Sequence, residues 1–112
     1  MTHDLDEMLA HARQRILHMP SNVRITWAPD AELDEGNHWA QWRHCRESGH
    51  WIGISDRLQD APRYVVQFIV VHEALHTVFR MRGHIAHSRA FRVAEYLWPD
   101  YDRAERWLEA HA

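Results

Sequence analysis

Two histidines and a glutamate stand at a spacing suited to metal chemistry. His72, Glu73 and His76 form a His-Glu-x-x-His motif. Residues four apart share one face of a helix, so both histidines would direct a ring nitrogen at one metal ion. Glu73 lies about 100° further round, too far to be a ligand but near enough to take a proton from a metal-bound water. The motif therefore predicts hydrolysis at a zinc site, with Glu73 as general base.

Catalytic zinc usually has three protein ligands and a water, so a third ligand is required. His87 is the preferred candidate, because Gly83 allows the chain to reverse after the motif and His87 would open the next helix. His84 and Glu95 are the alternatives. The chain has 11 His, which makes a chance motif possible. A pair of ordinary hydrogen-bonded histidines is therefore the competing interpretation of His72 and His76.

The helices that would position these residues follow from hydrophobic spacing. A helix from about Ala61 to Met81 is apolar on nearly every side and carries the motif near its end, with Asp60 as N-cap and Pro62 in its first turn. An amphipathic helix is expected from about Asp4 to His18. Two more helices are expected after Gly83, separated by Pro99. The first runs from His87 to Trp98, and its expected packing residues are Phe91, Ala94, Tyr96, Leu97 and Trp98. The second runs from Asp100 to His111, and its expected inward residues are Ala104, Trp107 and Leu108.

Three short segments between the first two helices predict strands. Val23 to Ala28 alternates apolar and polar residues, while His38 to Arg46 and Trp51 to Ser55 would form a hairpin. Polar loops are expected at Pro29 to Asn37 and Asp56 to Asp60. The order of elements predicts an α+β fold with a small antiparallel sheet, in one domain of residues 1–112.

Composition narrows the functional class. The formal net charge is -3, which argues against a nucleic-acid partner. No apolar run reaches the roughly 20 residues that span a membrane. The N-terminus does not resemble a signal peptide, and Cys45 is the only cysteine, so we expect a cytoplasmic protein. Without a paired histidine or helix N-terminus beside it, Cys45 is expected to be inert.

Several segments together resemble a known family of zinc peptidases. The run APRYVVQFIVVHEALH, then AHSRAF and WPDYDRAERWL, is similar to the YgjP-like metallopeptidases and, in the interval from His76 to His87, to the related SprT-like proteases. The matching stretch runs from Ala61 to Leu108, nearly half of the chain. The resemblance implies a minimal zincin-like fold with a sheet edge beside the cleft. It also implies Zn²⁺ as the cofactor, His72, His76 and His87 as its ligands, Glu73 as the catalytic residue, and a peptide or protein substrate.

Two other functional classes remain alternatives. One is a metal-dependent RNA hydrolase, since such a family also clusters three histidines after a buried helix, although it carries Gly after the first His. The other is a non-enzymatic binding module in which zinc serves folding. A structural zinc site should tolerate Glu73→Gln and an enzyme should not.

Further residues have a functional and a structural interpretation. For Trp39, Trp42 and Trp51, core packing is favoured over a wall of the substrate cleft. His38, His44 and His50 are more typical of surface histidines than of a second metal site. The candidates for stabilising an oxyanion are Arg80, Arg89, Tyr96 and Tyr101, among which the sequence does not choose.

Overall fold

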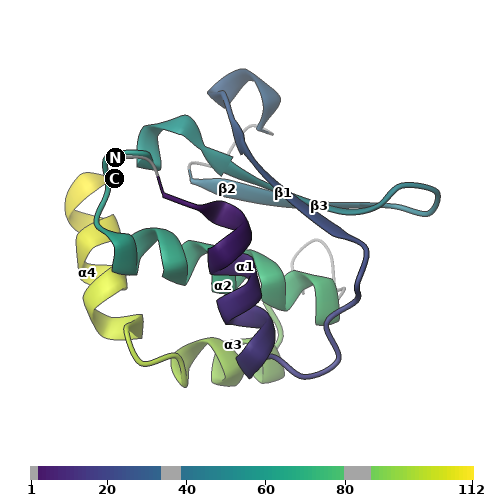
Figure 1. Ribbon diagram of the computed structural model, residues 1–112. Coiled ribbons are helices and arrows are strands. Elements are labelled where there is room, and N and C mark those ends of the chain that lie inside the picture. Colours follow the sequence, from purple (N-terminus) through teal and green to yellow (C-terminus); the bar gives the residue numbers. More distant parts are fainter. Residues whose placement is uncertain (1–2, 34–38, 80–86) are drawn as a thin grey trace.

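The fold is a three-stranded sheet covered on one side by helices (Figure 1). In the computed structural model the described residues are 3–33, 39–79 and 87–112. Their elements confirm the predicted α+β class. The strands are β1 (Val23–Ala28), β2 (Ala40–Cys45) and β3 (Gly49–Ser55), and the helices are α1 (Leu5–Arg15), α2 (Arg63–Val78), α3 (Arg89–Tyr96) and α4 (Tyr101–His111).

The sheet has the order β1-β3-β2 and is mixed. β2 and β3 form the predicted antiparallel hairpin, but β1 runs parallel to β3, with Ile25 opposite Ile52. The prediction of an antiparallel sheet was therefore wrong for β1. Alternation of apolar and polar residues identifies a strand and its inner face, whereas the neighbour and its direction depend on the path of the chain between strands.

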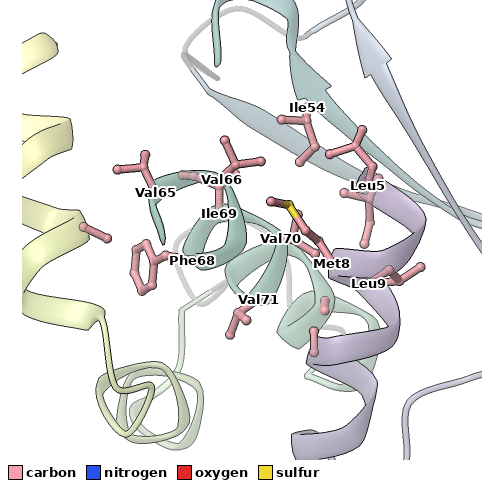
Figure 2. Packing of buried hydrophobic residues seen from close by; sticks show 14 of the residues in the cluster. Leu5, Met8, Leu9, Ile54, Val65, Val66, Phe68, Ile69, Val70 and Val71 are labelled. Carbon is pink, nitrogen blue, oxygen red and sulfur yellow. The ribbon is translucent and has the colours of Figure 1, made fainter. Parts of the chain in front are cut away.

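α2 is the central element, in contact with α1, α3, α4, β2 and β3. Twelve of its 16 residues are buried, as its continuous apolar sequence predicted. Val66, Ile69 and Val70 lie towards Ile54 of the sheet and Met8 of α1 (Figure 2), and the Gln67 side chain donates a hydrogen bond to the Met8 carbonyl at 2.9 Å. On the other side of α2, Phe68 meets Tyr101 at the start of α4 edge to face.

The helix boundaries differ from the predicted ones at several ends. Asp4 caps α1 by accepting a hydrogen bond from the Glu7 amide, and α1 ends at Arg15 rather than near His18. Asp60 is not the N-cap of α2. That position belongs to Pro62, whose ψ of 148° is extended, so the helix starts at Arg63. At its other end α2 stops at Val78, and Gly83 lies outside the described residues.

The third helix is shorter than predicted, and two of its expected packing residues are exposed. Ser88 caps α3 by accepting a hydrogen bond from the Phe91 amide, so α3 begins after His87. Phe91 and Trp98 are buried as expected, whereas Tyr96 and Leu97 are exposed. In so short a helix only one narrow face meets α2, and Phe91 and Glu95, four residues apart, lie on it. No helix among the described residues is both long and apolar enough to cross a bilayer.

Candidate metal centre

The last two turns of α2 bring the two motif histidines together. The ring centroids of His72 and His76 are 5.1 Å apart, with the rings nearly perpendicular. His76 is buried and His72 half-buried. This is the arrangement that i and i+4 spacing imposes on helical side chains, so the pair follows directly from the motif.

His87 reaches the same point from the start of a different element. Its Nε2 lies 3.2 Å from Nε2 of His76, and its ring centroid is 5.0 Å from that of His72. One ligand atom from each of the three histidines lies within 4.8 Å of the others. Two nitrogens bound to one tetrahedral zinc at about 2.05 Å would be about 3.3 Å apart, so the observed spacing suits a shared ion. Among the described residues, His87 is the candidate third ligand that joins the pair.

Phe91 supports this cluster from α3. Its side chain is fully buried, and its ring centroid lies 5.1, 4.7 and 4.9 Å from those of His72, His76 and His87. An apolar ring in contact with all three imidazoles restricts their rotation and keeps water from that side. The exposed edge of the cluster is at His87.

Glu73 is a buried carboxyl group beside the histidines. Its side chain is 5% exposed, and its Oε2 has no hydrogen-bond partner among the described residues. Burial raises its pKa to about 7, an effect that the charge of His72 opposes and that of Glu95 reinforces. A carboxyl group that titrates near neutrality can both accept and return a proton at that pH.

The three imidazoles differ in their electrostatic surroundings. Burial lowers the pKa of His76 to about 3, and the charges of His72 and His87 add to the effect. Burial and the charges of His72 and Arg92 also lower the pKa of His87, against an opposing effect of Glu95. For His72, burial also lowers the pKa, but the hydrogen bond to Glu95 and the charge of Glu73 outweigh it, and the net direction is upward. His76 and His87 are thus neutral at pH 7, which is the form that binds a metal.

Of the two alternative third ligands, only Glu95 lies among the described residues. His84 lies outside the described residues. Glu95 is buried and its Oε2 is hydrogen-bonded to Nδ1 of His72, so it meets the cluster through a histidine. The sequence offered Glu95 only as a ligand, because a downstream Glu is a ligand in some zinc peptidases. No feature of the sequence pointed to Glu105. The pKa of its carboxyl group is raised by burial and by the charge of Glu95.

Trp42 of β2 packs against the hydrophobic core, as the favoured interpretation expected, and it also lies against the histidine cluster. Its ring stacks on that of His76 at 5.8 Å and 13°, and its Nε1 donates a hydrogen bond to Nδ1 of the buried His50. The other two tryptophans have structural roles. Trp39 packs against Trp107, and Trp51 lies over Gly53 on the opposite face of the sheet. No local pattern distinguishes Trp42, because its contact depends on how β2 meets α2.

The structure gives less support to the candidates for a second metal site and for stabilising an oxyanion. The rings of His44 and His50 are 4.4 Å apart, but His38 lies outside the described residues, and within those residues only the cluster of His72, His76 and His87 has metal-binding geometry. Among the oxyanion candidates, Arg80 also lies outside, Arg89 and Tyr96 are exposed, and Tyr101 packs on Phe68.

Cys45 is exposed at the end of β2, apart from this cluster. Hydrogen bonds from Ser48 and the Glu47 backbone lower the pKa of its thiol to about 7. At neutral pH a larger fraction of this thiol is therefore in the thiolate form than for an ordinary cysteine.

A helix-borne His-Glu-x-x-His motif, completed by a third histidine under a small sheet, is the arrangement of a metallopeptidase domain. The comparison with protein families agrees: the model of the YgjP-like metallopeptidase domain matches residues 6–111. The chain therefore belongs to the YgjP-like family, as the resemblance had suggested. Neither the curated proteins nor the solved structures gave a match.

Proposed function

We propose that this chain is a zinc-dependent peptidase in which His72, His76 and His87 hold the ion and Glu73 is the general base. The observation that carries the proposal is the convergence of three imidazole ligand atoms within 4.8 Å, next to a buried carboxyl group whose pKa is about 7. Imidazole nitrogen is a preferred zinc ligand. Zinc held there would supply Lewis-acid chemistry, activating a water molecule and polarising a substrate carbonyl.

The work assigned to Glu73 is proton transfer. Its Oε2 is buried without a hydrogen-bond partner among the described residues, so it is available to an incoming water. With a pKa of about 7, the carboxylate accepts the proton of the attacking water and then donates it to the leaving amine. Desolvation is the main cause of this pKa, so it depends on Glu73 staying buried in α2.

The number of protein ligands favours catalysis over a purely structural role. Structural zinc sites are usually closed by four protein ligands, whereas catalytic sites have three and an open position. Within the described residues the cluster has three, and its third member is exposed. These features support an enzyme rather than a binding module that has kept zinc for folding.

The sheet edge suggests how a peptide would bind. β2 is the last strand of the order β1-β3-β2, and it contacts α2 through the stack of Trp42 on His76. The outer edge of such a strand offers backbone amide and carbonyl groups to an extended chain. A peptide aligned along β2 would run beside the histidine cluster, so we propose unfolded or extended protein segments as substrates.

The test is Glu73→Gln with Glu109→Gln as a matched control. Gln keeps the shape of Glu73 and removes the base, while Glu109 is an exposed residue of α4. Cleavage of a fluorescently labelled unfolded protein should fall at least about a hundredfold in Glu73→Gln and stay unchanged in the control. Zinc content, measured by elemental analysis, should remain near one per chain in both variants.

Three results would contradict this proposal in different ways. Cleavage by Glu73→Gln at the wild-type rate would show that Glu73 is not the general base. Loss of zinc from that variant would make Glu73 a ligand. A zinc-loaded wild-type protein that cleaves no unfolded substrate would favour the binding-module alternative.

A further inference from the structure

α3 contacts the histidine cluster through two residues of one face. Phe91 packs on all three rings, and Glu95, one turn later, is 8% exposed and hydrogen-bonded through Oε2 to Nδ1 of His72. Residues four apart in a helix share a face, so the packing of Phe91 also determines where Glu95 points. Glu95 is therefore held in its contact with His72 by the helix, and the contact joins segments 23 residues apart.

The hydrogen bond has a direct consequence for the His72 ring. A carboxylate only accepts, so Nδ1 of His72 must carry the proton. In the neutral ring the lone pair is then on Nε2, which is the nitrogen left for a metal. The same bond limits rotation of the ring about its Cβ–Cγ axis. His76 has no equivalent support, since its Nδ1 is buried without a hydrogen-bond partner among the described residues.

We infer that Glu95 is a positioning residue for the metal centre: it holds His72 as the Nδ1–H tautomer, with Nε2 directed at the ion, and it is not itself a ligand. The inference rests on the proposed function, in which the three histidines bind zinc. Carboxylates that accept a hydrogen bond from a metal-bound histidine fix its orientation and increase its basicity, and their loss typically weakens metal affinity 10–100-fold.

Two measurements on the purified full chain test this role. The first needs no metal: nitrogen-15 NMR of the metal-free protein reports which ring nitrogen of His72 is protonated. At a pH high enough for the His72 ring to be neutral, the wild type should contain the Nδ1–H tautomer, and Glu95→Ala should shift the ring towards a mixture of both tautomers. Retention of the pure Nδ1–H tautomer in Glu95→Ala would show that Glu95 does not control it.

The second measurement is zinc affinity, obtained by competition with a chromophoric chelator. Glu95→Ala should bind one zinc about 10–100-fold more weakly than the wild type. Glu95→Gln, which keeps a carbonyl oxygen for the Nδ1–H and guards against misfolding, should recover part of that loss. His87→Ala, which removes a ligand, should be weaker than either, and His111→Ala, on the exposed end of α4, should match the wild type.

Failure of this inference differs from failure of the proposed function. Unchanged zinc affinity in Glu95→Ala would overturn the positioning role while leaving the zinc site intact. A loss of more than about a hundredfold in Glu95→Ala, together with wild-type affinity in His87→Ala, would make Glu95 the third ligand. A wild-type chain that binds no zinc would overturn the proposed function, and the NMR result would still decide the Glu95–His72 contact.

Discussion

Replacing Glu73 with Gln should stabilise the metal-free protein at alkaline pH and lose that advantage in acid. Burial raises the pKa of Glu73 from 4.5 to about 7 in the folded chain. The folded state therefore binds this proton more tightly than the unfolded state does. Folding is favoured by this difference below about pH 4.5, and stability declines as the pH rises through about 7, where the buried group must ionise. Gln has no proton to lose, so the variant avoids that decline.

The size of the effect follows from the pKa change. Raising a pKa from 4.5 to about 7 corresponds to about 3 kcal/mol of unfolding free energy, fully expressed above pH 7. This conversion is suitable because the side chain is only 5% exposed, so solvent screens it little. The buried amide of Gln adds a penalty of about 1–3 kcal/mol where it lacks a partner, but that penalty is the same at every pH.

The assay is urea unfolding in the presence of a chelator, at several values between about pH 5 and pH 8. The difference in unfolding free energy between Glu73→Gln and the wild type should change in favour of the variant by about 3 kcal/mol across that range. Glu109→Gln, at an exposed site, should show no such trend. A difference that stays constant from pH 5 to pH 8 would refute the reasoning, because it would mean that Glu73 ionises normally in the folded chain.

Two further substitutions test the framework of the site. Gly53→Ala should destabilise the protein by about 1–3 kcal/mol in urea unfolding, because the added Cβ would overlap the Trp51 ring, and should be nearly neutral in a Trp51→Ala background. Ser88→Ala should lower the unfolding free energy by about 1 kcal/mol, because it removes the N-cap of α3. Zinc titration should also show weaker binding, since His87 immediately precedes that cap. Unchanged zinc affinity would mean that the position of His87 does not depend on the N-cap of α3.

The sequence alone determined the parts of the site that lie within one element. The apolar run from Val65 to Val71 required a buried helix, and α2 is that helix. The spacing of His72 and His76 required that they share a face of it, because helical geometry is local. The alternation in Val23–Ala28 likewise identified a strand. Each of these conclusions depends on backbone geometry over a few residues, which the local sequence controls.

Contacts between elements needed the tertiary structure. β1 lies parallel to β3, and Trp42 stacks on His76, because of how the sheet is assembled and laid on α2. The sequence proposed three possible third ligands, and only the packing of α3 brought His87 to His76 while directing Glu95 at Nδ1 of His72. Contacts between residues far apart along the chain depend on how many side chains pack together across the whole domain. A short stretch of sequence does not determine that packing.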